Sequence, residues 1–154
     1  MPIHNVQCPL LENNLTPNIV LSTFGPLLAG EVSVPSKIAE VIQKTKKEIP
    51  NPITGPALID TGAASTCVDE EILKNLGLPI VGEQPIATPS GPSKAYLYPV
   101  KLEFPGSPIP PLEFNRVIGA NLKDQKIAIL IGRDILQHCI LIYNGPGGHF
   151  SLSF

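Results

Sequence analysis

The chain has 154 residues, of which 13 are acidic and 11 basic, so its formal net charge is −2. One domain accounts for this length, and the lack of a basic excess argues against binding to nucleic acid or to an anionic membrane. Hydrophobic residues make up 43% of the chain, and 18 prolines and 13 glycines interrupt them, which predicts a core of short strands rather than long helices.

The cysteines and the N-terminal residues indicate a compartment. Cys8, Cys67 and Cys139 are odd in number and far apart, so they predict neither a disulfide framework nor a zinc site. No apolar run reaches the length of a membrane span, and residues 1–14 lack the pattern of a secretory signal. We therefore expect a cytoplasmic protein without a metal or another cofactor.

The first part of the chain divides into an arm and the start of a domain. Residues 1–24 show no clear period and predict an irregular N-terminal arm, with a single domain over residues 25–154. Alternating polarity over residues 27–34 predicts a strand. A short helix should follow, starting at Pro35 and stopping before Pro50.

A buried strand and a well-capped helix come next. The apolar residues 57–59 predict a strand that leads directly into Asp60. Asp69 suits the N-cap of a helix whose first turn holds two glutamates, and Gly77 suits the position after its C-terminus. The acids at 69–71 are therefore explained by capping rather than by catalysis.

A hairpin is predicted in the middle of the chain. Residues 84–104 follow a period of two, which is typical of strands with one buried face. Pro89, Ser90, Gly91 and Pro92 interrupt this pattern, so we expect the tip at Ser90–Gly91.

The C-terminal third predicts three more strand regions and a short helix. The strands fall at residues 112–118, at the continuous apolar run 127–131, and at a terminal hairpin of residues 140–143 and 150–154, with a helix from Arg133 to about His138. The run 127–131 is typical of a strand covered on both faces. Because the last strand is apolar on one face up to its end, it needs a cover, which either its own lobe or a second copy of the chain would supply.

The sharpest chemical signal is Asp60-Thr61-Gly62. A carboxylate directly after a buried strand is costly unless hydrogen bonds compensate for its lost hydration. Thr61 offers a hydroxyl, and Gly62 lets the backbone turn tightly and bring an N–H close to the acid. An Asp-Thr-Gly triplet alone is a weak signal, so its context has to carry the interpretation.

That context resembles the retropepsin-like aspartic proteases, in particular the single-lobe bacterial members. The matching segments are 57–66 (ALIDTGAAST) and 129–136 (ILIGRDIL), and the segment 143–148 (YNGPGG) with its following strand is similar to the bacterial type. The resemblance covers residues 27–154.

The resemblance implies a mostly β fold, a closed barrel-like lobe with two or three short helices, which is active as a homodimer. Hydrolysis of a peptide bond by carboxylates needs one acid and one base on the same water. The chain has a single Asp-Thr-Gly, so two Asp60 side chains, one from each protomer, would form the pair. Two carboxylates at such close range share one proton.

The resemblance also assigns roles to single residues. Asp60 is the expected catalytic residue of an aspartic endopeptidase, and Thr61 and Gly62 are expected to support its loop. Thr88, Ser90 and Gly91 are the expected flap over an extended peptide or protein substrate. Gly132 and Arg133 are expected to have structural roles near the site.

The sequence departs from the retroviral pattern after the triplet. Ala63, Ala64 and Ser65 stand where retroviral members usually carry a second acid that pairs with the arginine after the glycine. Asp134 or Asp69 could replace that acid.

Two questions stay open. Cys67 is either a small packed side chain or a redox-sensitive thiol near the site. The chain as a whole is a protease, a non-catalytic module of the same fold that dimerises and binds peptides, or a β-rich structural domain unrelated to the family.

Overall fold

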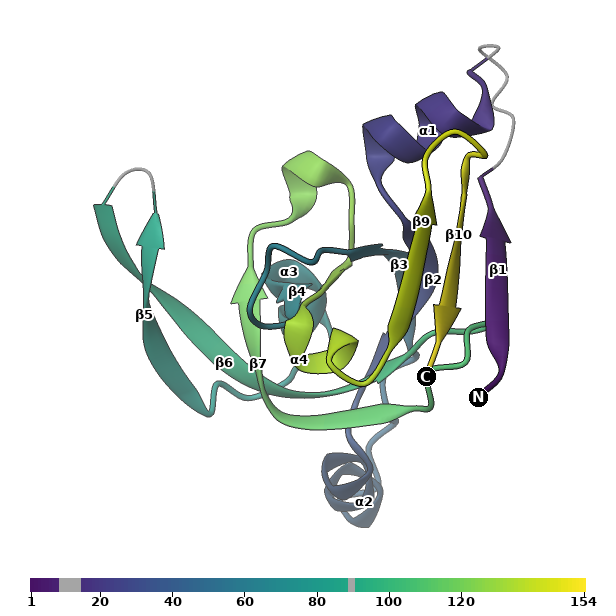
Figure 1. Ribbon diagram of the computed structural model, residues 1–154. Coiled ribbons are helices and arrows are strands. Elements are labelled where there is room, and N and C mark those ends of the chain that lie inside the picture. The colour runs from purple at the N-terminus through teal and green to yellow at the C-terminus, as the bar shows by residue number, and fades with distance from the viewer. Residues whose placement is uncertain (9–14, 89–90) are drawn as a thin grey trace.

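The computed structural model describes residues 1–8, 15–88 and 91–154, and most of its regular structure is strand (Figure 1). The strands are β1 (Ile3–Gln7), β2 (Leu27–Ser33), β3 (Ile53–Ile59), β4 (Cys67–Asp69), β5 (Gly82–Thr88), β6 (Gly91–Glu103), β7 (Leu112–Ala120), β8 (Ile129–Ile131), β9 (Ile140–Asn144) and β10 (His149–Ser153). The helices are α1 (Pro17–Phe24), α2 (Ser36–Lys44), α3 (Glu70–Asn75), α4 (Arg133–Leu136) and the 3-10 helix η1 (Lys123–Gln125). The predicted mostly β class is confirmed.

Seven strands form one sheet in the order β2-β3-β8-β4-β7-β6-β5. Strand β2 also pairs with β6 through Glu31–Glu103, Val32–Leu102 and Ser33–Lys101, so the sheet closes on itself and only β5 stands outside the ring. Apolar side chains fill the ring: Val32, Val68, Val100, Leu102, Ile129 and Ile131 are fully buried. Burial of these side chains is the main source of stability.

Strand β8 lies in the middle of this ring and brings two distant parts of the chain together. It runs parallel to β3 and antiparallel to β4, so both of its edges are paired. The register sets Ile59 beside Ile131, and the N–H of Asp60 donates to the carbonyl of Ile131 at 3.0 Å. The turn after β3 therefore lies next to Gly132.

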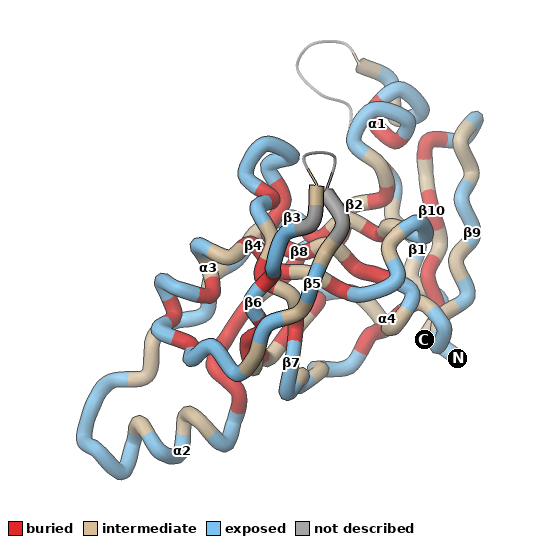
Figure 2. The backbone as a smooth tube through the Cα atoms, turned by 90° about the vertical axis from the view of Figure 1, so that its left-hand side faces the viewer, coloured by how far each residue is buried: buried red, intermediate tan, exposed pale blue. Residues whose placement is uncertain are grey.

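The two ends of the chain form a separate three-stranded sheet in the order β1-β10-β9. Strand β10 is its centre, with Phe150 and Leu152 fully buried, while its neighbours are largely exposed or half-buried (Figure 2). Strand β1 of the same chain pairs with β10 along its whole length, so the last strand is not an edge of this sheet.

The N-terminal segment is less irregular than predicted. It contributes β1 and α1, so the described residues hold four α-helices rather than two or three. Strand β1 has no period of two in its apolar residues and owes its shape to pairing with β10. Helix α1 follows a recognisable signal, since Thr16 occupies its N-cap and Pro17 its first turn.

The remaining elements agree with the predicted pattern. The Asp69 carboxylate caps α3 by accepting from the N–H of Glu71 at 3.1 Å, and Gly77 follows the helix with a positive φ of 65°. Strands β5 and β6 form the predicted hairpin with Thr88 opposite Gly91, and Pro89 and Ser90 of its tip lie outside the described residues. None of the described helices has the length and apolar character needed to cross a bilayer.

Candidate active site

The carboxylate of Asp60 lies at the carboxyl end of β3 and is partly exposed. Its Oδ1 accepts a hydrogen bond from the N–H of Gly62 at 2.7 Å, and its Oδ2 accepts none from the described residues. A Cβ at Gly62 would lie 3.0 Å from Oδ1, which is why the backbone approaches the acid so closely only with glycine there. The site therefore holds one fixed carboxylate oxygen and one that is open to a ligand.

Arg133, the first residue of α4, holds the turn after Asp60. Its Nη1 donates to the carbonyls of Thr61 and Gly62, both at 2.9 Å, and its backbone N–H donates to the carbonyl of Ala63 at 3.0 Å. Bonds from a guanidinium are stronger than neutral ones. In the described part of the chain no carboxylate pairs with Arg133, so the expected pairing with Asp134 or Asp69 is not formed.

Asp134 instead binds Thr66, a contact that the sequence did not predict. Its carboxylate accepts from the N–H of Thr66 at 2.9 and 3.0 Å, from the Thr66 hydroxyl at 2.7 Å, and from the N–H of Ile135 at 3.0 Å. The same Thr66 hydroxyl oxygen accepts from the N–H of Gly132 at 3.1 Å. Thr66 thus joins the segment after Asp60 to the segment after β8.

Gly132 packs against this segment with no room for a side chain. A Cβ there would lie 2.4 Å from the carbonyl carbon of Ser65, 2.7 Å from its oxygen and 2.8 Å from the nitrogen of Thr66. All three are backbone atoms, which cannot rotate away as a side chain can. The close approach of the two segments depends on this glycine.

The other acids near the site are occupied by backbone amides. Asp69 accepts from Glu71 and, with its second oxygen, from the N–H of Leu122 at 3.0 Å, while Asp134 is held as described above. Neither of them faces Asp60 as a hydrogen-bonded partner. Of these three acids, Asp60 is the one whose second oxygen accepts no hydrogen bond from the described residues. The exposed hydroxyl of Thr61 makes no hydrogen bond to a described residue.

Cys67 lies at the start of β4, and its thiol is 3.7 Å from the carbonyl oxygen of Ser65. Burial, reinforced by the negative charges of Asp134 and Asp60, raises the pKa of this thiol to about 11. Since the thiolate is the reactive form of cysteine, this environment favours the interpretation as a small packed side chain over a redox-sensitive thiol.

The hairpin residues assigned to the flap are only partly described. Gly91 begins β6 opposite Thr88, with a φ of 111° that favours glycine. Ser90 and the side chain of Thr88 lie outside the described residues.

A groove of about 350 Å³ lies beside β3, and neither Asp60 nor the turn after it lines this groove. Leu58 of β3, Phe24 of α1 and Ile127 line it together with Leu27 and Lys126. Its wall is mainly apolar, so it suits an apolar side chain. Part of this wall comes from the N-terminal segment. No group of three or more His, Cys, Asp or Glu side chains is placed to hold a metal within the described ranges.

Comparison with known proteins gives a consistent result. The model of a family described as aspartyl protease matches residues 48–135, more than half of the chain. The crystal structure of a retropepsin-like aspartic protease from Rickettsia conorii has 12% identity and a TM-score of 0.51, and the alignment covers 98% of this chain and 91% of that one. The solution structure of the simian foamy virus (mac) protease has 19% identity and a TM-score of 0.44, with 72% and 91% covered. No curated protein matched by sequence.

Proposed function

The chain belongs to the aspartyl protease family, and from that premise we propose that it is an endopeptidase in which two copies each supply one Asp60. The resemblance to retropepsin-like proteases is confirmed, and the fold is that of the Rickettsia structure. The observation that carries the proposal is a single, partly exposed carboxylate with one oxygen held by Gly62 and the other open.

Hydrolysis needs both a general acid and a general base, which a single carboxylate cannot supply at once, whereas a pair of Asp60 side chains can. Two carboxylates within about 3 Å cannot both ionise, so the pair keeps one proton. The unprotonated carboxylate removes a proton from water, and the water oxygen attacks the carbonyl carbon of the peptide bond. The protonated carboxyl donates a hydrogen bond to the carbonyl oxygen as negative charge develops there. The titration of such a pair belongs to both residues together.

The terminal sheet supports a homodimer. The register of its strands sets six residues side by side on one face: Ile3, Ser153, Ile140, Asn5, Ser151 and Ile142. None of them is charged, and Ile3, Ile140 and Ile142 are exposed around a hollow of about 160 Å³. In that hollow the hydroxyl of Ser153 is buried and has no hydrogen-bond partner among the described residues. Six uncharged residues side by side suit contact with a second copy of the chain, because none of them brings a like charge to the axis.

The hairpin of β5 and β6 and the groove beside β3 support an extended peptide as substrate. We assign the hairpin as the flap, with Thr88, Ser90 and Gly91 at its end. The groove lined by Phe24 and Leu58 would take an apolar side chain of the peptide. Substrate backbone would pair with protein backbone in the manner of an added strand. The cytoplasmic location remains our proposal, resting on the odd and widely spaced cysteines.

The direct test is cleavage of an unfolded protein between about pH 4 and 7 by the wild type and by Asp60→Asn. Loss of the acid–base pair should lower kcat at least about 10³-fold, with an unchanged unfolding midpoint. If the Asn variant cleaves as fast as the wild type, the mechanism is wrong. If the wild type binds peptide as a dimer but cleaves nothing, the chain is the non-catalytic peptide-binding module.

The requirement for two copies has its own test. Wild type and Asp60→Asn are unfolded together in equal amounts and refolded, so that subunits pair at random. A shared site predicts about one quarter of the pure wild-type activity at equal total protein, whereas independent sites predict about one half. Sedimentation of each sample shows whether dimers are present, and a strict monomer with full activity would exclude the shared site.

A further inference from the structure

The end of the β5–β6 hairpin is a two-stranded ribbon that projects from the ring (Figure 1). Residues 82–88 pair with residues 91–97, and the pairing with β7 begins only at Leu97. We call the paired residues 82–88 and 91–97 the ribbon. Because a lone two-stranded ribbon has little stability of its own, the part of the chain from which it leaves the ring determines its direction.

The ladder between β6 and β7 is interrupted at that root. Tyr98 lies opposite Val117, but Val100 lies opposite Phe114, so the register shifts between them. Between these pairs Pro99 of β6, which has no N–H to donate to a ladder, stands opposite two residues of β7, Asn115 and Arg116. The extra residue therefore lies on β7, and a bulge bends the strand that carries it. The backbone at the root therefore has a joint rather than a continuous set of bonds.

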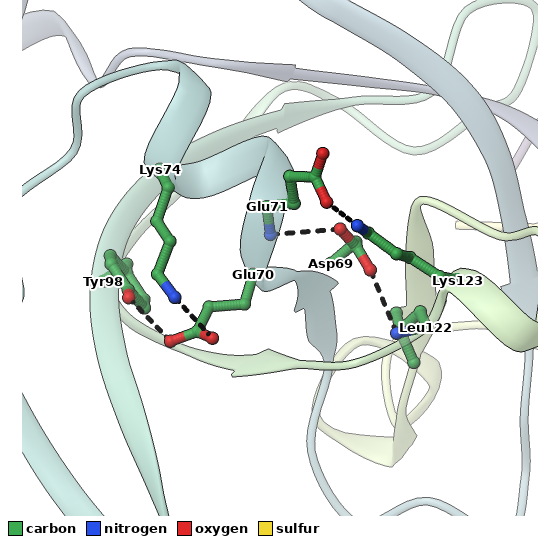
Figure 3. Close-up of polar contacts among 7 residues, drawn as sticks. All are labelled: Asp69, Glu70, Glu71, Lys74, Tyr98, Leu122 and Lys123. Carbon is green, nitrogen blue, oxygen red and sulfur yellow. Dashed lines mark hydrogen bonds and ion pairs between the residues drawn. The ribbon is translucent and has the colours of Figure 1, made fainter.

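The side chain of Tyr98, the residue before Pro99, makes a buried contact beside this joint. Its ring is 1% exposed, and its hydroxyl donates to Oε1 of Glu70 at 2.9 Å (Figure 3). A Cβ at Gly119 would lie 2.8 Å from the ring of Tyr98 and 3.1 Å from Cγ of Glu70. The absence of a side chain at Gly119 thus makes room for both partners of the hydrogen bond.

Glu70 connects this root to the loop of Asp60. It is the first residue of α3, directly after β4, and β4 pairs with both β7 and β8. Its second oxygen accepts from Lys74 at 2.9 Å, which fixes the carboxylate from the other side (Figure 3). The chain from Asp60 reaches Glu70 through Thr66, whose amide and hydroxyl Asp134 holds. The two acids are therefore linked by anchored backbone.

We propose that the hydrogen bond between Tyr98 and Glu70 sets the angle at which the ribbon leaves the ring, so that both are positioning residues for the ribbon. The effect on substrate rests on the proposed function, since it requires the ribbon to close over a peptide. The effect on the direction of the ribbon does not rest on that function, because it follows from the interrupted ladder at Pro99 and from the hydrogen bond between Tyr98 and Glu70 beside it.

Amide hydrogen exchange of the whole protein tests the joint without any substrate. Tyr98→Phe keeps the ring and removes only the hydroxyl. Exchange at residues 82–88 and 91–97 should rise about tenfold, because a hydrogen bond to a charged group is lost. The matched control is Tyr143→Phe in β9 of the other sheet, which removes the hydrogen bond from the Tyr143 hydroxyl to the carbonyl of Leu21 in α1. That control should leave exchange in the ribbon unchanged.

Kinetics separate positioning from a merely structural role. In Tyr98→Phe, KM for a peptide should rise about tenfold while kcat stays within about twofold. A role in stability alone would lower the active fraction and leave KM unchanged. Glu70→Ala should also raise KM, whereas Glu70→Gln keeps an acceptor for Tyr98 and should have a KM close to that of the wild type. These two variants provide the test if Tyr98→Phe does not fold.

The outcomes distinguish this inference from the proposed function. Unchanged exchange in the ribbon of folded Tyr98→Phe and Glu70→Ala overturns it, whatever the activity. Raised exchange in a chain that cleaves no peptide supports the joint while the proposed protease activity fails. Raised exchange together with a raised KM supports both.

Discussion

The loop of Asp60 and the ribbon of β5 and β6 belong to the same proposed site but are held in opposite ways. The loop is fixed from several directions, by Arg133, by the bridge between Thr66 and Asp134, and by the tight contact of Gly132. The ribbon is a single layer attached at one root. The difference matches what the proposed function would require of each part, because acid–base chemistry needs fixed geometry and closure over a substrate needs movement.

The largest effect should come from filling the space at Gly132. Gly132→Ala would place a Cβ against backbone atoms of Ser65 and Thr66, the nearest at 2.4 Å. Since these atoms cannot rotate away, the free energy of unfolding should fall by about 3 kcal/mol or more. Urea unfolding measures this value, and peptide cleavage should be lost with it.

Gly82→Ala is the matched substitution on the ribbon. Its Cβ would meet only a methyl group of Leu97 at 3.4 Å, which is ordinary contact, so stability should stay within about 0.5 kcal/mol. If Gly132→Ala and Gly82→Ala lowered the free energy of unfolding equally, the contrast between a tightly packed loop and an open ribbon would be wrong.

The next effect should come from the carboxylate that anchors Thr66. Asp134→Ala leaves the buried amide and hydroxyl of Thr66 without this acceptor, which should cost about 2–3 kcal/mol. Asp134→Asn keeps one acceptor oxygen and should cost clearly less. Both values come from urea unfolding, and kcat should fall in the same order because the loop of Asp60 loosens. A drop in kcat without any loss of stability would argue for a direct chemical role of Asp134.

The local parts of this site could be predicted from the sequence. Asp60, Gly62 and Gly132 are recognisable because each follows an apolar strand and fits a tight turn. The cap of α3 was equally readable, since Asp69, the two glutamates and Gly77 all act within a few residues. Short-range rules suffice where donor and acceptor are neighbours in the chain.

The long-range contacts could not be predicted in this way. Strand β1 forms only because β10 offers it an edge, although the two lie at opposite ends of the sequence. Asp134 or Asp69 was expected to replace the second acid of the retroviral pattern, which pairs with the arginine after the glycine. The buried amide of Thr66 took the carboxylate of Asp134 instead, since an unsatisfied buried N–H is costly. The hydrogen bond between Tyr98 and Glu70 could not be predicted from the strand pattern around Tyr98 or from the helix pattern around Glu70.

Acidic pH should weaken the root of the ribbon. The hydrogen bond from Lys74, with a smaller contribution from Tyr98, lowers the pKa of Glu70. A lowered pKa in the folded state means that this stability is present above the ordinary glutamate value and is lost as the pH falls through the folded value. The free energy of unfolding, measured with urea from pH 6 down to 2.5, should fall as the pH falls. Glu70→Gln should make this fall, the acid limb of the stability curve, less steep.

The order of the two contributions sharpens this prediction. Lys74→Met should shift the acid limb to higher pH more than Tyr98→Phe does, because the lysine bond is the larger cause. An acid limb that is the same in Glu70→Gln and in the wild type would assign it to other carboxylates. Glu113 is one of these, since its hydrogen bonds from Ser36 also lower its pKa.

The smallest effect should come from the ion pair on the ribbon itself. Glu83 and Lys94 face each other across β5 and β6 at 2.6 Å, but their side chains are 51% and 67% exposed. Exposed pairs contribute little, since water and salt screen them and two long side chains must be held in one geometry. Lys94→Met should therefore leave the unfolding midpoint unchanged within error, and exchange in the ribbon should stay near the wild-type rate. If removing Lys94 loosened the ribbon as much as removing the hydroxyl of Tyr98, the ribbon would be held along its length. The root would then no longer be the part that controls its position.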